Sequence, residues 1–349
     1  MKKKKWQRMW RFLPLAALAI FALTGCGVKS VSTLTPGGIV ARIEAHLMLQ
    51  SLLIMVVVVV VVGFLFTYAL IRYRKRPGQE DQIPIQVEGN ALLEVLWTVI
   101  PIILLIILAF PTVSKTFAVS DTAVPKHHGD NVVVVKVTAH QFWWQFDYPD
   151  YGITTAEDLF IPTGKKVVFQ ITSSDVIHSF WVPALGGKQD ANPGQTNSEY
   201  LIADKPGTYS GECAELCGSS HARMYFNVRA VTPSEFKAWT QEMKAGPTAP
   251  TTASAQTGQA LFKANCMACH AVGKTGGNLA PNLTNFADRE KIAGFLTHDK
   301  TTVEKWIKDP SSLKPGALMP ARGAKGDLTD EQINDIADYL FTLSVKHNQ

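Results

Sequence analysis

The sequence predicts a multidomain membrane protein built from a two-helix transmembrane hairpin, an all-β sandwich or barrel, and a small all-α domain. Two long apolar stretches predict the hairpin, because each is long enough to cross a bilayer as a helix. Short β-rich runs separated by turn residues predict the sandwich or barrel. A Cys-x-x-Cys-His motif followed by an amphipathic helical pattern predicts the α domain.

The first 25 residues have the pattern of an export signal. A basic start, Lys2–Lys5, precedes a short apolar run over 12–23, which ends in Leu23-Thr-Gly-Cys26. This order indicates a signal peptide at 1–25 rather than a membrane span. Its end resembles a bacterial lipoprotein signal, which implies lipid attachment to Cys26; the alternative is an ordinary leader followed by an incidental cysteine.

The next segment, 26–120, contains the two apolar stretches at about 47–71 and 92–113. The first includes a run of valines, but an isolated strand cannot satisfy its backbone in lipid, so we expect a helix. The basic cluster Arg72–Arg76 follows it and belongs in the cytoplasm by the positive-inside rule. The mature N-terminus and the soluble C-terminal domains then lie on the outer face of the cell membrane.

Glu94 is the ionisable residue at the inner end of the second apolar stretch. An ionisable side chain near the membrane interior indicates a proton path. The alternative is an interfacial carboxylate that reaches water and has no role in chemistry.

Residues 121–244 form the predicted β domain, and they carry a cluster of soft metal donors. Cys213, Cys217, His221 and Met224 lie within one short segment, and His178 lies upstream. This donor set favours copper, and two thiolates can bridge two metal ions. A disulfide between the two cysteines or a Cys2His2 zinc site are the alternatives, although neither gives Met224 a role.

A small, uncharged segment at 245–256 predicts a flexible linker, after which 257–349 form the helical domain. Cys266, Cys269 and His270 are the attachment signature of a covalent c-type haem, with the histidine as one axial ligand of the iron. A thioredoxin-like motif would need a βαβ context that this region lacks. For the second axial ligand, Met319 is favoured over His298, since methionine with histidine is the pair found in cytochromes c.

Together these motifs resemble cytochrome c oxidase subunit II with a fused cytochrome c domain, as in bacterial caa(3)-type haem-copper oxidases. The resemblance implies a cupredoxin-like β domain and a class I cytochrome c domain. It implies a binuclear Cu(A) site with two bridging thiolates, two terminal imidazoles, a thioether and a backbone carbonyl, which are Cys213, Cys217, His178, His221, Met224 and Glu215. The Glu215 carboxylate would help to hold a magnesium ion shared with subunit I, and Glu94 would lie at the entrance of a proton pathway.

The implied function is electron relay. External cytochrome c would reduce the haem, the copper pair would follow, and the haems of subunit I would reduce oxygen to water, coupled to proton translocation. Subunits I and III and membrane lipid are the expected partners. The formal charge of +5 resides mostly in the leader and the inner loop, so no nucleic-acid partner is expected. The alternatives are a subunit of another Cu(A)-containing reductase, such as nitric oxide reductase, and a free-standing membrane-anchored electron carrier.

Two residues depart from the family pattern. Phe142 stands where family members that accept electrons from soluble cytochrome c usually have tryptophan, so Phe142, Trp143 and Trp144 are all candidates for electron uptake. Core packing is the alternative role for all three. Gln195 stands where the family has an arginine, so one interface charge is missing.

Overall fold

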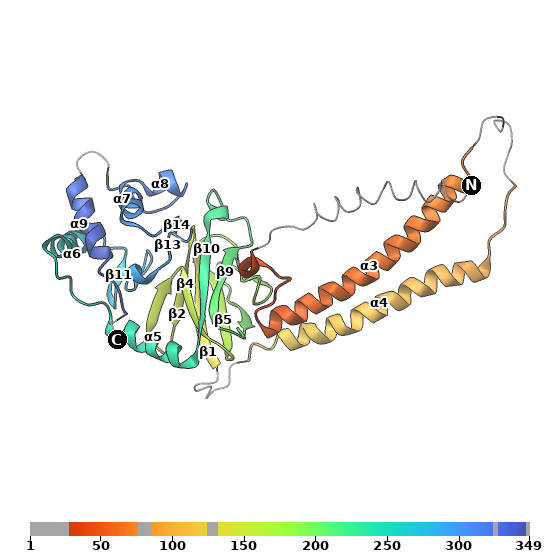
Figure 1. Cartoon of the computed structure of the whole chain (residues 1–349), viewed down its shortest axis with the longest axis horizontal. Helices are drawn as coiled ribbons and strands as arrows, with labels where there is room; N and C mark the ends of the chain where they lie inside the picture. Colours follow the sequence, from red (N-terminus) through yellow and green to blue (C-terminus); the bar gives the residue numbers. More distant parts are fainter. Residues whose placement is uncertain (1–27, 76–77, 79–84, 124–131, 324–326, 347–349) are drawn as a thin grey trace, which may run out of the picture.

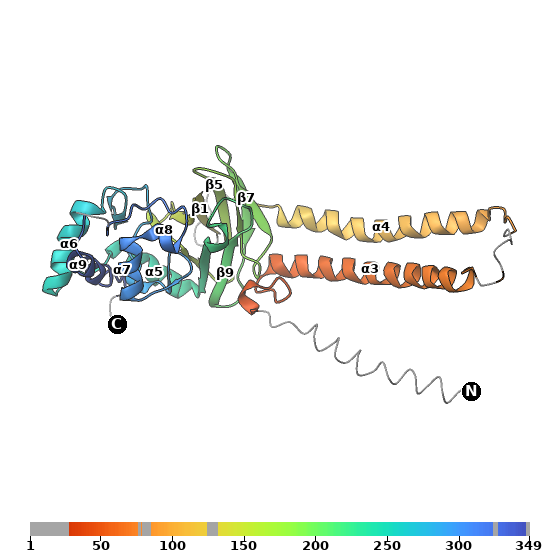
Figure 2. The same cartoon turned by 90° about the horizontal axis from the view of Figure 1, so that it is seen from above.

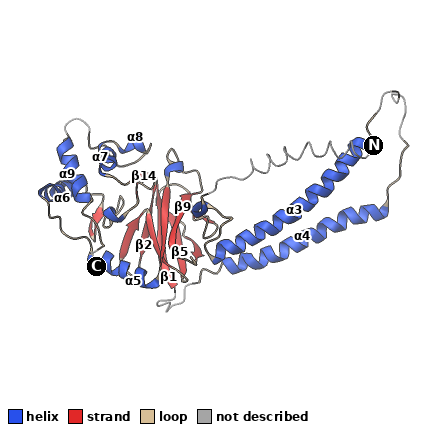
Figure 3. Ribbon diagram, viewed as in Figure 1, coloured by secondary structure: helices blue, strands red, loops and turns tan. Residues whose placement is uncertain are grey.

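The computed structural model describes residues 28–75, 78, 85–123, 132–323 and 327–346. Two long helices lie side by side and extend from one side of a β-sandwich, and a group of short helices lies on the opposite side (Figures 1 and 2). The strands form the centre of the molecule (Figure 3). The predicted fold class, a transmembrane hairpin with a β-sandwich and a helical domain, is confirmed.

The two long helices are α3, Ile39–Arg72, and α4, Ala91–Val119, and both are long and apolar enough to cross a bilayer. α3 begins at Ile39, before the predicted span of about 47–71, because its first turns pack on the sandwich. Val40, Ala41 and Ala45 are buried there, and the Ala41 amide donates to the Leu185 carbonyl at 3.1 Å. A helix of 34 residues is about 51 Å long, which leaves room for this outer section beyond the hydrocarbon core.

The sandwich consists of two five-stranded sheets. The first has the order β3-β2-β1-β5-β8, with the bounds β1 Val132–His140, β2 Trp143–Tyr148, β3 Ile153–Ala156, β5 Lys166–Ser173 and β8 Asn197–Leu201. The second has the order β4-β10-β9-β6-β7, with the bounds β4 Asp158–Pro162, β6 His178–Trp181, β7 Lys188–Ala191, β9 Gly207–Cys213 and β10 Tyr225–Val231. The pairs β1–β5 and β4–β10 are parallel, and the other pairs are antiparallel.

Aromatic side chains from both sheets fill the space between them. The rings of Phe180 and Phe226 stack with centroids 4.8 Å apart, and Phe146 packs against both of them. The chain passes from the first sheet to the second at Glu157, which has a positive φ of 65° and lies between β3 and β4. This crossing leaves the Glu157 side chain buried at the edge of the sandwich.

Helix α5, Pro233–Ala245, closes the sandwich, and helix α6, Ala253–Asn265, opens the C-terminal domain. Thr252 caps α6 by accepting a hydrogen bond from the Ala255 amide. The last four residues of the predicted linker, 253–256, therefore belong to this helix. The difference arises because alanine, serine and threonine suit a capped helix start as well as a linker.

The C-terminal domain is built on the crossing of α6 with α9, Asp330–Leu340. The helices approach closely at Gly258, where a side chain would collide with the Asp335 carbonyl. A capping box between Thr329 and Gln332 is present at the start of α9. The remaining elements are short: β11 Ala271–Val272, β12 Thr275–Gly276, η4 Phe286–Asp288, β13 Lys291–Ile292, β14 Leu296–Thr297, α7 Lys300–Lys308 and α8 Pro310–Leu313.

Candidate copper centre and haem cavity

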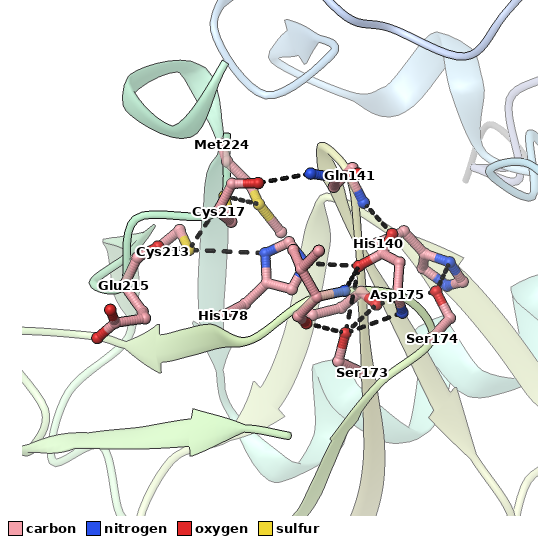
Figure 4. Close-up of polar contacts among 12 residues, drawn as sticks. His140, Gln141, Ser173, Ser174, Asp175, His178, Cys213, Glu215, Cys217 and Met224 are labelled. Carbon is pink, nitrogen blue, oxygen red and sulfur yellow. Dashed lines mark hydrogen bonds and ion pairs between the residues drawn. The ribbon is translucent and has the colours of Figure 1, made fainter. Parts of the chain in front are cut away.

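The metal-donor cluster lies where strands β6 and β9 meet at one end of the second sheet. His178 is the first residue of β6 and Cys213 is the last of β9, so these two ligands stand at strand ends rather than on loops. The pairing of Phe180 with Cys213 sets their register. As a result, the Cys213 Sγ atom lies 3.8 Å from His178 Nδ1 and 3.8 Å from Cys217 Sγ (Figure 4).

The segment between β9 and β10 brings the other donors to the same place. Cys217 Sγ lies 3.7 Å from His221 Nδ1 and 3.8 Å from Met224 Sδ. The Glu215 carbonyl oxygen lies 3.3 Å from Cys213 Sγ. The short helix η3, His221–Arg223, returns the chain so that Met224 faces the sulfur atoms. All six predicted copper ligands therefore converge.

The spacing of the donors tests whether they fit metal ions. Donors bonded at 2.0–2.3 Å to one tetrahedral ion stand roughly 3.3–3.8 Å apart. The five separations above fall in this range. A disulfide needs about 2.05 Å between its sulfur atoms, and Cys213 and Cys217 are free cysteines. Two thiols, two imidazoles and a thioether in contact form the soft set that copper prefers, and zinc would leave Met224 unused.

Asp175 orients the His178 ring. Its Oδ1 lies 2.8 Å from His178 Nε2, which leaves Nδ1 directed at Cys213. Burial lowers the pKa of His178, but the hydrogen bonds to Cys213 and Asp175 outweigh it and raise that pKa. The hydrogen bond between the two thiols is the largest cause that lowers the pKa of Cys213, and the hydrogen bond with His178 lowers that pKa further. A carboxylate behind a ligating histidine is the usual support of a metal site.

A cavity of about 570 Å³ lies between the C-terminal domain and the sandwich. The haem-attachment residues Cys266, Cys269 and His270 line it, and so does Met319. His270 Nδ1 is 2.8 Å from the Pro281 carbonyl oxygen, to which it donates, so Nε2 remains free for iron. Burial lowers the pKa of His270, which favours the neutral imidazole that ligates a metal. These residues fit a covalent haem.

His298, the competing axial ligand, has a different place. It is not among the residues that line the cavity. Its ring stacks on Phe341 and meets Phe286 edge-on, with centroids 5.0 Å away in both cases. The structure therefore brings Met319, and not His298, to the haem cavity.

The three aromatic candidates for electron uptake have different surroundings. Phe142 and Trp143 line the haem cavity from the sandwich side. Trp143 stacks on His140 with centroids 4.1 Å apart. Trp144 points into the sandwich core, where it is fully buried and its ring centroid lies 6.1 Å from that of His178.

The side chains of two predicted site residues lie apart from these centres. Glu94 is exposed in the first turn of α4, at the end of the hairpin that is remote from the sandwich (Figure 1). The Glu215 side chain is exposed and points away from the sulfur atoms (Figure 4). Cys26 lies outside the described residues.

Comparison with known proteins gives matches along the chain. The profiles described as cytochrome c oxidase subunit II, transmembrane domain; cytochrome c oxidase subunit II, periplasmic domain; and cytochrome c match residues 40–114, 152–231 and 255–344. The cytochrome c oxidase subunit 2 of Alkalihalophilus pseudofirmus is 48% identical over 98% of this chain and 99% of its own length. The chain belongs to the cytochrome c oxidase subunit II family.

Within the family, it has the form that carries a fused cytochrome c domain, as predicted. The cytochrome c oxidase subunit 2 of Bacillus sp. strain PS3 is 47% identical over 97% of this chain and 98% of its own length. By contrast, the quinol oxidase subunit 2 of Bacillus cereus is 37% identical over 69% of this chain and 82% of its own length. The similarity to the two cytochrome c oxidase subunits thus extends over nearly the whole chain, whereas the similarity to the quinol oxidase subunit does not.

Sequence reasoning missed three supporting residues. Asp175 could have been found, because an acid three residues before a ligating histidine is a candidate hydrogen-bond partner. Gln141, which donates from Nε2 to the Cys217 carbonyl at 2.5 Å, carries no such local signal. Pro281 acts through its backbone carbonyl, so its side chain gave no indication of the role.

Proposed function

We propose that this chain is the electron-accepting subunit II of a bacterial caa(3)-type cytochrome c oxidase. It takes electrons from external cytochrome c at the haem of its C-terminal domain and relays them through a copper pair to the haems of subunit I. There, oxygen is reduced to water with translocation of protons. Family membership over the full chain supports this function over a nitric oxide reductase subunit or a free-standing carrier.

One observation carries the relay: residues 140–143 contact both centres. They line the haem cavity, and within them Gln141 donates from Nε2 to the Cys217 carbonyl. The Gln141 amide also donates to Asp175 Oδ2 at 2.6 Å, and Asp175 holds His178. Hydrogen bonds therefore run from the cavity wall to both sides of the copper site.

The residues that hold the cofactors follow from the donor positions. When bound, the copper pair and the haem each supply a one-electron carrier. Cys213, Cys217, His178, His221, Met224 and the Glu215 carbonyl would hold the coppers, with the two thiolates shared between the ions. Cys266 and Cys269, which line the cavity, would attach the haem covalently, and His270 and Met319 would hold its iron. Ligands fixed on strand ends move little, which favours electron transfer.

Phe142 and Trp143 are the residues through which electrons leave the haem cavity toward copper. Both line the cavity, and the cavity wall to which they belong is hydrogen-bonded to the copper ligands. Trp144 has a packing role beside His178, because it faces the core and does not line the cavity.

Glu215 and Glu94 act toward subunit I. The segment Cys213–Met224, which we call the copper-ligand segment, carries the exposed Glu215 carboxylate. There this carboxylate can share a magnesium ion with subunit I. Glu94 lies at the entrance of a proton pathway whose remainder belongs to subunit I. Subunit III and membrane lipid complete the surroundings of the hairpin.

The proposed topology places the sandwich and the cytochrome c domain on the outer face. The outer ends of both long helices contact the sandwich, as in the hydrogen bond from Tyr200 to the Ala118 carbonyl at 3.3 Å. The basic residues Arg72, Arg74 and Lys75 lie at the opposite end, which is cytoplasmic by the positive-inside rule. Residues 1–25 are then a signal peptide, and Cys26 is the lipidated first residue of the mature chain.

Rapid mixing of the purified oxidase with reduced cytochrome c tests this function. We expect the haem c absorption to change first, the copper electron paramagnetic resonance signal second, and the haems of subunit I last. The Cys217→Ser variant should stop the sequence after haem c reduction. Reduction of subunit I at an unchanged rate in that variant would contradict the relay.

A further inference from the structure

The C-terminal domain contacts the copper domain through a short segment, Leu313–Gly316, which we call the strap. The strap begins at Leu313, the last residue of α8, and precedes Met319. Its Pro315 carbonyl accepts hydrogen bonds from the hydroxyls of Ser219, at 2.8 Å, and Ser220, at 2.7 Å. Both serines lie between two copper ligands, Cys217 and Met224. The strap therefore connects the copper-ligand segment with the haem axial methionine.

Lys314 is the central residue of this contact. Its Nζ donates to the Phe142 carbonyl at 2.6 Å and to the Ala293 carbonyl at 2.8 Å, which joins the two domains through one ammonium group. The residue is 3% exposed. Burying an ammonium group is unfavourable unless the group has hydrogen-bond partners. The Phe142 and Ala293 carbonyls provide such partners for Lys314.

Buried charges on the two sides of the contact are complementary. The copper domain contributes Glu157 and Asp158, and the C-terminal domain contributes Arg289 and Lys314; all four are buried. The ionised Glu157 carboxylate is attracted to Lys314 and Arg289, and the ionised Asp158 carboxylate is attracted to Arg289, while the two acids repel each other. At its rim, Arg229 NH1 of the copper domain lies 3.1 Å from Glu290 Oε1 of the other domain. Complementary charges across a contact favour one specific arrangement of the two domains.

The Phe142 ring packs against one glycine from each domain. A side chain at Gly218 of the copper-ligand segment, or at Gly316 of the strap, would come within 3.1 Å of the ring. Both glycines have positive φ angles, 135° and 80°, which favour glycine. The ring therefore marks the point of closest approach between the copper-ligand segment and the strap.

We propose that Lys314 is a positioning residue that holds the haem domain in one docked register against Phe142. Electron transfer between the two cofactors then occurs within a fixed complex, and residues 246–252 connect the domains without serving as a tether for a mobile donor. This inference rests on the proposed function, because it concerns transfer from haem c to copper.

The first test measures the rate of electron transfer from haem c to copper in the intact oxidase after photochemical reduction of the haem. In the wild type, we expect this rate to be independent of solvent viscosity. A rate that falls as viscosity rises would overturn docking, since a mobile domain must diffuse before each transfer. This measurement needs no variant.

The second test uses Lys314→Met, which keeps the aliphatic stem and removes the ammonium. We expect the haem-to-copper rate to fall about tenfold and to become viscosity-dependent. The pulsed-resonance distance distribution between oxidised haem and copper should broaden. Lys308→Met is the matched control, because Lys308 pairs with Asp330 within its own domain, at 2.9 Å. An unchanged rate and distance distribution in Lys314→Met would overturn the role of Lys314.

Different results would contradict the proposed function and the positioning role of Lys314. Haem absorption and the copper resonance report whether each cofactor is bound in every variant. If the wild type carries both cofactors and no electron passes from haem to copper, the proposed function is wrong. If electrons pass from haem to copper but the wild-type rate falls as viscosity rises, the docked register is wrong. If the wild-type rate is independent of viscosity and Lys314→Met changes neither the rate nor its viscosity dependence, only the positioning role of Lys314 is wrong.

Discussion

Asp175 contacts His178, a proposed copper ligand, and the Gln141 amide at the same time. Its Oδ1 lies 2.8 Å from His178 Nε2, and its Oδ2 accepts from the Gln141 backbone at 2.6 Å. One carboxylate thus fixes both the imidazole ring and the turn that faces the haem cavity. Its removal should affect the metal and the cavity wall together.

We therefore expect Asp175→Asn to lower copper affinity by roughly 10–100-fold, the usual cost of losing a partner behind a metal ligand. Copper retention during a chelator challenge, followed by electron paramagnetic resonance, measures this. Asp147→Asn is the control, since Asp147 bonds Thr154 and Gln145 away from the ligands. Retention equal to that of the wild type would show that Asp175 does not support the site.

Met319 and His298 give a second pair of variants with opposite outcomes. Met319→Ala should change the haem absorption spectrum and lower the reduction potential of haem c, because a thioether ligand raises that potential. His298→Ala should leave both unchanged and only lower the stability of the domain, since His298 packs between Phe286 and Phe341. A spectral change in His298→Ala alone would reverse the ligand assignment.

Local sequence patterns were sufficient to predict the elements and most of the donors. Four of the copper ligands with side-chain donors lie within one short segment, the haem signature is contiguous, and the capping box marks the start of α9. These signals work because short-range geometry determines them. The section of α3 before the predicted span had no such signal, because its first turns are defined by contact with the sandwich rather than by lipid.

The contact between the domains could not be predicted in this way. Lys314 and Phe142 are 172 positions apart, and a lysine between a short helix and a proline usually faces water. Glu157 likewise gives no local sign that it will be buried where the chain changes sheets. Such pairs depend on how two folded domains meet, which periodicity and motif spacing do not encode.

Glu94 provides a test of proton uptake. We expect Glu94→Gln to lower the steady-state oxygen consumption of the oxidase severalfold, while the rate of electron transfer from haem c to copper stays the same. The reason is its position: Glu94 lies at the far end of α4 from both centres, so it cannot influence the relay directly. Glu88→Gln, in the exposed segment before α4, is the control. Equal oxygen consumption in the two variants would mean that Glu94 only stabilises the first turn of α4 and has no role in proton uptake.

The pKa of Glu157 predicts how the stability of the sandwich and the C-terminal domain docked on it depends on pH. Burial raises the pKa of Glu157 from 4.5 to about 7, against the opposing charges of Lys314 and Arg289, while Asp158 adds to the rise. The native state therefore holds a proton that the unfolded chain has lost between these two values. The stabilisation from this group is complete below about pH 4.5 and is lost as pH rises to about 7, by up to about 3 kcal/mol.

Denaturant unfolding of the holo-oxidase at pH 5 and pH 7, followed through haem c absorption, measures this change. Glu157→Gln should flatten the difference between the two pH values, because the amide does not titrate. Glu331→Gln, an exposed carboxyl in the first turn of α9, should leave the difference as it is in the wild type. If Glu157→Gln keeps the full pH dependence, another group accounts for it; the carboxyl at the domain contact would then be ionised throughout, paired with Lys314 and Arg289.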